Sequence, residues 1–222
     1  MLIVHHLNNS RSQRVLWLLE ELGVGYEVKR YQRDAKTMLA PPELRAVHPL
    51  GKSPLVQDGD VVLAESGAIV EHLADRHGEG RLARAHGSPE RFQYIYWLHY
   101  AEGSAMSPLL LKLVFDRVVA APMPFFVKPV ARGIAKSVTA AFIGPQLELH
   151  LDYLEGELAK REWFVEGAFS AADVQMSFPL ETAVARGVLD DRRPHLIAWL
   201  RRIHERPAYR RALERGGPYG FV

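Results

Sequence analysis

Cysteine is absent from all 222 residues of this sequence. Without a thiol, the chain cannot form a disulfide, a zinc–thiolate site or a cysteine nucleophile. Any thiol chemistry that the protein performs must therefore use a thiol that a substrate brings.

Long apolar runs and an excess of one charge are missing too. No run approaches the about 18 residues that cross a bilayer, and Met1–His6 becomes polar too soon for a signal peptide. The formal net charge is only +2, which argues against a dedicated nucleic-acid binder. The arginines that crowd residues 186–215 recur at helical spacing, as on a solvated helix face. We expect a cytoplasmic protein that binds neither membrane nor nucleic acid.

Motifs of several other chemistries do not occur. The sequence has no G-x-x-x-x-G-K-[ST] or G-x-G-x-x-G run for a nucleotide, and Ser66 is not in a G-x-S-x-G elbow. His5 and His6 are adjacent on a predicted strand and so face opposite sides. His72 and His77 are five apart, which misses the i, i+4 match on a helix. We expect no metal site.

The first eighty residues alternate strand and helix patterns. The turn Asp58-Gly59-Asp60 between two apolar runs predicts a hairpin, and Gly23 ends the first helix. Strands are predicted at 2–6, 26–31, 55–57 and 61–63, and helices at 14–22, 43–47 and 66–76. This order predicts a mixed α/β sheet.

Helix breakers at 77–80 and 85–87 mark a boundary, after which only helical patterns follow. The predicted helices are 89–120, 130–160, 171–187, 194–205 and 208–214. We therefore predict two domains, 1–79 and 87–222, of which the first is α/β and the second all-α.

Ser10 lies between the first predicted strand and the first helix. Ser10-Arg11-Ser12-Gln13 fits the S-x-x-Q capping box, which is a structural role. A helix start also favours an anion, so the same hydroxyl could donate a hydrogen bond to a bound thiolate. A free thiol titrates near pH 8.5, and lowering that pKa by about two units requires about 2.7 kcal/mol. One charge-assisted hydrogen bond of about 1.5–3 kcal/mol is of that size.

Two further segments carry polar groups beside helix or strand starts. Lys52-Ser53-Pro54 precedes a strand, and a cis Ser53–Pro54 bond would turn the backbone of Ser53 outward toward a peptide. Glu65-Ser66 begins a helix, where Glu65 could bind an ammonium and Ser66 a carboxylate. The alternatives are a solvated lysine at position 52 and a helix cap at Ser66.

These segments, in this order and spacing, resemble the glutathione transferases, and are most similar to a branch from bacteria and fungi. The resemblance rests on residues 6–22, 49–54 and 65–69. It implies a thioredoxin-like first domain, with Ser10 stabilising the glutathione thiolate. Lys52, Ser53, Glu65 and Ser66 would bind the rest of glutathione, and Asn9 or Ser12 could share the role of Ser10.

The second predicted domain also resembles that family. Residues 164–173 resemble its capping motif, in which Ser170 and Asp173 would fix a buried helix start. Residues 97–104 resemble the helix that faces the active cleft. From helical spacing after Trp97 we expect three side chains to wall the electrophile pocket or to be ordinary core: Tyr100, Met106 and Leu110.

The resemblance implies a homodimeric detoxification enzyme that uses glutathione as co-substrate to attack hydrophobic electrophiles. Glutathione-dependent reduction of organic hydroperoxides would use the same thiolate. A non-catalytic binding or regulatory protein with the same fold is the alternative from another class. The absence of cysteine argues against the branches that form mixed disulfides with glutathione.

Overall fold

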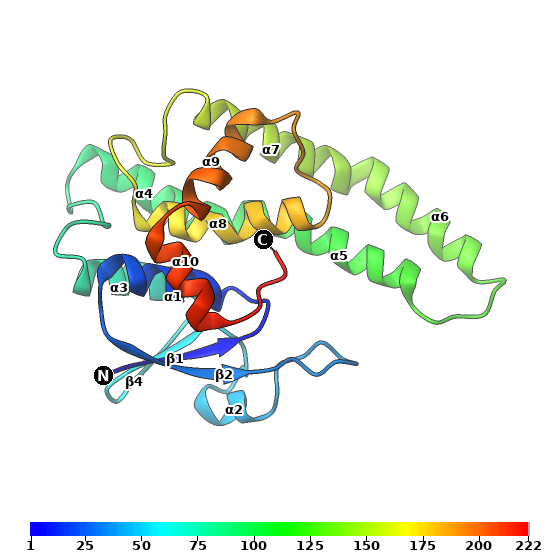
Figure 1. Ribbon diagram of the computed structural model, residues 1–222. Helices are drawn as coiled ribbons and strands as arrows, with labels where there is room; N and C mark the ends of the chain where they lie inside the picture. Colours follow the sequence, from blue (N-terminus) through cyan, green and yellow to red (C-terminus); the bar gives the residue numbers. More distant parts are fainter. Residues whose placement is uncertain (222) are drawn as a thin grey trace.

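The computed structural model describes residues 1–221, and its N-terminal part is built on one four-stranded sheet (Figure 1). The strands are β1 (Leu2–Leu7), β2 (Tyr26–Tyr31), β3 (Leu55–Asp58) and β4 (Val61–Ala64). Their order is β2-β1-β3-β4; β2 runs parallel to β1, whereas β1–β3 and β3–β4 are antiparallel. The predicted mixed sheet is confirmed.

Helices cover both faces of this sheet. The helices α1 (Ser12–Leu22) and α3 (Ser66–His77) lie on the face toward the helical part, and α2 (Glu43–Val47) lies on the other face (Figure 1). Because α1 crosses over between the parallel strands β1 and β2, the carboxyl end of β1 leads directly to the start of α1.

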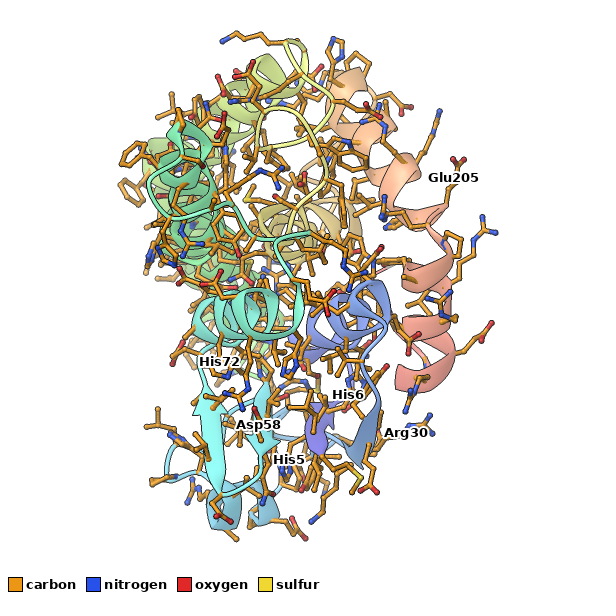
Figure 2. All side chains as sticks on the ribbon, turned by 90° about the vertical axis from the view of Figure 1, so that its left-hand side faces the viewer. His5, His6, Arg30, Asp58, His72 and Glu205 are labelled. Carbon is orange, nitrogen blue, oxygen red and sulfur yellow. The ribbon has the colours of Figure 1, made fainter. Side chains whose placement is uncertain are left out.

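The alternation of side chains along β1 separates its two histidines. His5 Nδ1 is 2.9 Å from the hydroxyl of Tyr31 on β2, whereas His6 Nδ1 is 2.9 Å from the hydroxyl of Ser12 on α1. The two imidazoles thus lie on opposite sides of the sheet, as the sequence predicts (Figure 2).

The remainder of the described chain is helical. Each of the two long predicted helices contains one π-helical turn. The elements are α4 (Pro89–Tyr100), η1 (Ala101–Ala105), α5 (Met106–Ala120), α6 (Lys128–Val138), η2 (Thr139–Ile143), α7 (Gly144–Leu158), α8 (Ala171–Ala185), α9 (Pro194–His204) and α10 (Pro207–Gly216). In Figure 1, α5 and α6 project from the rest as an arm. Among these described helices, none is both long enough and apolar enough to cross a membrane.

The core is continuous between the two parts. Helix α8 is buried along nearly its whole length and contacts α1 and α3 from the first part and α4 from the second. Trp17 on α1 and Trp97 on α4 belong to the same buried cluster. The parts therefore differ in secondary structure but share one interface, and the boundaries 1–79 and 87–222 stay a prediction.

The start of α8 is held by a complete capping box, as predicted. The Asp173 carboxylate accepts from the backbone N–H of Ser170 at 3.0 Å and from the Ser170 hydroxyl at 3.2 Å. It also accepts from Phe164 N at 3.0 Å and from Trp199 Nε1 at 3.3 Å. Burial raises the pKa of Asp173 to about 6, against the opposing effect of these donors. This serine–aspartate pair joins three segments of the helical part.

Candidate active site

Two adjoining clefts lie at the edge of the sheet where β1 and β4 end and β3 begins. They have volumes of about 360 and 760 Å³ and share four lining residues: Arg11, Leu50, Lys52 and Ser53. The smaller cleft is also lined by Glu65, Ser66 and Glu102, and the larger one by the loop after β2 and by Leu110. Together the clefts form one groove between the sheet domain and the helical part.

Glu65 and Ser66 stand where β4 passes into α3. Glu65 has a left-handed backbone with φ of 67°, which is uncommon for a residue with a side chain, and its carboxylate is exposed at the smaller cleft. Ser66 is buried, and its hydroxyl accepts from Arg14 Nη2 at 2.5 Å. An exposed acid therefore stands next to the amide donors of a helix start.

Lys52 and Ser53 lie between the two clefts. Lys52 is exposed, and no carboxylate among residues 1–221 forms an ion pair with it. Ser53 precedes Pro54 through a cis peptide bond, as the family resemblance implies. The Ser53 hydroxyl donates to the carbonyl of His5 at 3.2 Å.

Ser10 lies directly behind Ser53. Its side chain is 3% exposed; its Oγ is 3.4 Å from Ser53 Oγ and 2.8 Å from Ser12 Oγ, and it accepts from the backbone N–H of Ser12 at 3.2 Å. Ser10 does not itself line either cleft. Its hydroxyl lies within hydrogen-bond distance of a residue that lines both.

The predicted capping box at Ser10 is wrong. The N-cap residue of α1 is Arg11, and no side chain caps the helix. The side-chain amide of Gln13 has no hydrogen-bond partner among the described residues, and the Ser10 hydroxyl accepts from only one backbone N–H, that of Ser12. The reason is packing, because Gln13 Oε1 lies against Gly216 of α10. A Cβ at position 216 would collide with this oxygen. The amide therefore points away from the start of α1.

Ser12 and His6 extend the hydroxyl cluster into the interior, a feature that sequence reasoning missed. Ser12 Oγ lies 2.9 Å from His6 Nδ1 and accepts from Leu7 N at 3.2 Å. Burial, and then the charge of Arg30, lower the pKa of His6 to about 4. A neutral imidazole thus ends a chain of three hydroxyls that begins at the cleft. The hint in the sequence is that His6 shares the helix-facing side of β1.

An ion-pair network contacts the buried hydroxyl of Ser66, and sequence reasoning did not predict it. The buried Arg14 guanidinium contacts Ser66 Oγ, the carbonyl of Gln175 at 2.6 Å and the carboxylate of Glu102. Arg11 Nε donates to the same carboxylate at 2.8 Å. Burial opposes the ionisation of Glu102, but Arg14 and Arg11 together hold its pKa below the usual value. The network fixes α1, the start of α3 and η1 relative to one another.

The three residues expected at the electrophile pocket lie in two different environments. Tyr100 and Met106 are 7% and 5% exposed, belong to the main core and line neither cleft. The Tyr100 hydroxyl is 2.6 Å from His150 Nδ1, inside the helical part. Leu110 is 52% exposed and lines the larger cleft. The core interpretation therefore holds for Tyr100 and Met106, which pack in the buried cluster, whereas Leu110 lies at the cleft.

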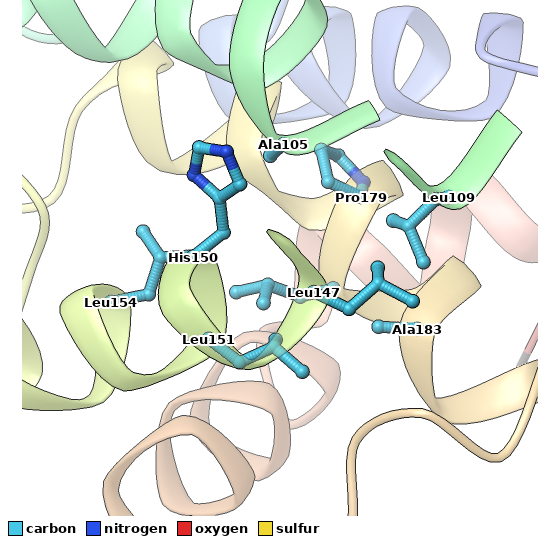
Figure 3. Close-up of a pocket in the computed structure, with 9 residues that line it drawn as sticks. Ala105, Leu109, Leu147, His150, Leu151, Leu154, Pro179 and Ala183 are labelled. Atoms are coloured by element: carbon cyan, nitrogen blue, oxygen red, sulfur yellow. The ribbon is translucent and has the colours of Figure 1, made fainter. Parts of the chain in front are cut away.

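A third cavity lies within the helical part and is too small for an electrophile. It is lined by Ala105, His150, Pro179 and neighbouring leucines (Figure 3). Its volume is about 20 Å³, which is room for about one water molecule. Within the described residues, no group of three or more His, Asp or Glu side chains is arranged to hold a metal ion.

Known proteins match the chain along almost its whole length. The family models "Glutathione S-transferase, N-terminal domain" and "Glutathione S-transferase, C-terminal domain" match residues 1–75 and 135–207. Glutathione S-transferase 3 of Schizosaccharomyces pombe is 37% identical over 97% of this chain and 88% of its own. Glutathione S-transferase 1 of Saccharomyces cerevisiae is 35% identical over 98% and 96%.

Solved structures give the same result. A glutathione S-transferase from Actinobacillus pleuropneumoniae is 35% identical, with a TM-score of 0.78 over 97% of this chain and 93% of its own. A sphingomonad glutathione S-transferase complexed with glutathione has a TM-score of 0.74 over 97% and 98% of the two chains. At 24% identity, this second structure shows a common fold only.

Proposed function

The chain belongs to the glutathione S-transferase family, and we propose that Ser10 stabilises the thiolate of glutathione bound in the smaller cleft. The observation that carries this proposal is the position of the Ser10 hydroxyl, 3.4 Å from that of Ser53 at the junction of the two clefts. Glutathione is the co-substrate, since curated relatives of the chain are glutathione S-transferases.

The smaller cleft offers complementary groups for both ends of the tripeptide. In our proposal, Glu65 binds the ammonium of the γ-glutamyl group, and Ser66 with the start of α3 binds its carboxylate. Lys52 binds the glycyl carboxylate, and Ser53 contacts the cysteinyl part. The exposed carboxylate of Glu65 and the exposed ammonium of Lys52 both border this cleft and have no opposite charge bound to them within residues 1–221, which supports this assignment.

Ser10 can donate to sulfur because Ser12 can supply its other hydrogen bond. Ser10 Oγ and Ser12 Oγ are 2.8 Å apart, and either can be the donor. When Ser12 donates to Ser10, the Ser10 hydrogen is free for the sulfur. A thiolate then attacks the electrophile: a C–S bond forms, the leaving group departs with its electron pair, and the thiol proton has already passed to solvent. Proximity of the two bound reactants supplies the rest of the acceleration.

Glutathione binding by calorimetry tests the assignment of the cleft. We expect Glu65→Gln to weaken binding by about 10-fold, as the loss of one charge-assisted hydrogen bond implies. Glu79→Gln is the matched control, because Glu79 is also an exposed glutamate with a left-handed backbone but lines neither cleft. Equal affinities of the two variants would contradict the proposed orientation of glutathione.

For the electrophile pocket we propose only one of the three expected residues. We assign Leu110 to the wall of the larger cleft, whereas Tyr100 and Met106 support the core behind it. Conjugation of a chlorodinitrobenzene and reduction of an organic hydroperoxide, measured side by side with glutathione, will separate transferase from peroxidase activity. Retention on immobilised glutathione with no turnover of either substrate would instead favour a binding protein.

We further propose that the chain is a homodimer with a role in detoxification, and a cytoplasmic location stays a prediction. Exposed apolar side chains along α5, α6 and their connection support self-association: Val114, Val118, Phe125, Phe126, Val130 and Ile134. Light scattering after size-exclusion chromatography should give twice the mass of the 25.0 kDa chain. A monomer at micromolar concentration would contradict the dimer.

A further inference from the structure

The larger cleft carries more positive charge than its own acids offset. Its lining includes four basic side chains and one acidic side chain, Asp34. The basic residues are Arg11, Arg33, Arg45 and Lys52. Asp34 Oδ1 turns back into its own loop, where it accepts from the backbone N–H groups of Lys36 and Thr37. The cleft therefore presents a net positive wall.

Arg33 is held in place by neutral groups alone. Its Nε donates to the carbonyl of Asn8 at 3.2 Å, Nη1 to that of Met38 at 3.1 Å, and Nη2 to that of Asn9 at 3.3 Å. Three carbonyls fix the plane of the guanidinium, which has five N–H donors and so keeps two for a ligand. Within residues 1–221, no carboxylate forms an ion pair with Arg33. The Arg33 guanidinium is therefore fixed in position, and no carboxylate neutralises its charge within these residues.

Neighbouring arginines increase this positive potential. Burial, followed by the charges of Arg11 and Arg117, lowers the pKa of Arg33. Arg11 forms an ion pair with Glu102, but the same carboxylate also forms an ion pair with Arg14. Arg117 belongs to α5 and is close enough for its charge to lower the pKa of Arg33. An anion in the cleft would meet positive charge from both α5 and the loop after β2.

Apolar side chains line the same cleft beside Arg33. Leu39 and Leu110 are both more than half exposed, and Met38 has its carbonyl on Arg33 and its side chain in the lining. A ligand that fits this wall has an apolar body and one negative end.

We propose that the electrophile of this enzyme is an organic anion, whose carboxylate or similar group binds Arg33 while its apolar body lies against Leu110 and Leu39. The inference rests on the proposed function, because it assigns the second substrate of the same site. It goes beyond that function by requiring a charged co-substrate. Lys52 at the smaller cleft remains for the glycyl carboxylate of glutathione, so Arg33 is free for the second anion.

A matched pair of electrophiles tests this proposal. One is a chlorodinitrobenzoate with its carboxylate para to the chlorine, and the other is the corresponding benzamide. In both, the glutathione sulfur forms a bond to the ring carbon, chloride leaves with its electron pair, and the thiol proton passes to solvent. Rates are divided by those of free glutathione, which removes the difference in intrinsic reactivity between the two rings.

We expect kcat/KM to favour the benzoate by about 10-fold or more, the usual effect of a hydrogen bond to a charged group. Arg33→Gln should abolish this preference and leave KM for glutathione unchanged, and Arg33→Lys should restore part of it. Arg30→Gln is the matched control, because Arg30 also donates to a backbone carbonyl, that of Arg215, but lies beside α10 and lines neither cleft (Figure 2).

Several results would overturn the proposal. These are equal use of both electrophiles, a preference that persists in Arg33→Gln, or a KM for glutathione that rises in this variant with both electrophiles. The last result would place the glycyl carboxylate on Arg33. Calorimetry with unreactive dinitrobenzoate and dinitrobenzamide separates this inference from the proposed function: Arg33-dependent binding of the acid by a chain without turnover would uphold the anion site and refute the transferase mechanism.

Discussion

Ser10 and Ser170 both lie just before a helix, and their surroundings differ. Ser170 forms a closed pair with Asp173, in which every carboxylate contact is internal and both residues are fully buried. Ser10 precedes Arg11, the N-cap residue of α1, and accepts from only one backbone N–H, that of Ser12. The Gln13 amide makes no hydrogen bond within the described residues, and the Ser10 hydroxyl lies 3.4 Å from that of Ser53 at the clefts. A similar S-x-x-polar pattern therefore gives a capping box at Ser170, whereas at Ser10 it gives no capping box and leaves the hydroxyl beside Ser53.

Removal of the Asp173 carboxylate should have the largest effect on stability. Asp173→Ala leaves buried donors of Phe164, Ser170 and Trp199 without an acceptor. We expect the free energy of unfolding to fall by about 3–5 kcal/mol. Urea denaturation followed by tryptophan fluorescence measures this loss. A loss below about 1 kcal/mol would mean that the closed pair at α8 does not hold the helical part together.

Ser10→Ala should act on turnover rather than on folding. Loss of one hydrogen bond to a thiolate should lower kcat/KM at neutral pH by about 10- to 100-fold. The loss should shrink above pH 8.5 or so, where a free thiol ionises without help. A pH–rate profile with a chlorodinitrobenzene measures both effects. The same fold-loss at every pH would show that Ser10 contributes something other than thiolate stabilisation.

Ser170→Ala should show the reverse behaviour. The loss of a helix N-cap costs about 1 kcal/mol, so the thermal midpoint should fall by a few degrees while kcat/KM of the remaining folded enzyme is unchanged. Differential scanning fluorimetry and the same kinetic assay give the two values. A pH-dependent change in turnover in this variant would remove the contrast between the two serines.

Gln13→Met should have the smallest effect. The buried Gln13 amide makes no hydrogen bond within the described chain, and replacing an unsatisfied buried amide by an apolar side chain of similar size is nearly neutral or stabilising. We expect a change in the free energy of unfolding within about 1 kcal/mol. A larger destabilisation would show that Gln13 completes the cap of α1 after all.

The sequence predicts most of the fold because its patterns are local. The Asp58-Gly59-Asp60 turn, Gly23 after α1 and the 3.6-residue periodicity after residue 89 each act within a few neighbours. The predicted elements agree with the structure to within a few residues. The π-helical turn η1 was not predicted, because no residue type marks it. Tyr100 and Met106 were not separated from Leu110, because helical spacing does not tell a core face from a cleft face before the packing partners are known.

The candidate site was predictable only where its residues are adjacent in sequence. Glu65-Ser66 and Lys52-Ser53 lie at cleft edges because each sits at the start of a strand or helix. The contacts of Ser12 with His6 and of Arg14 with Glu102 join elements distant in sequence, which only the packed structure brings together. Arg33 gives no sequence signal, since its position depends on three backbone carbonyls.

The pKa of the glutathione thiol in its complex with the enzyme tests the central claim most directly. It can be read from the ultraviolet absorbance of the thiolate as pH is raised, with saturating protein. We predict a bound pKa about one to two units below the free value of about 8.5 for the unaltered chain, and a value close to the free one for Ser10→Ala. The same bound pKa in both proteins would contradict the assignment of Ser10.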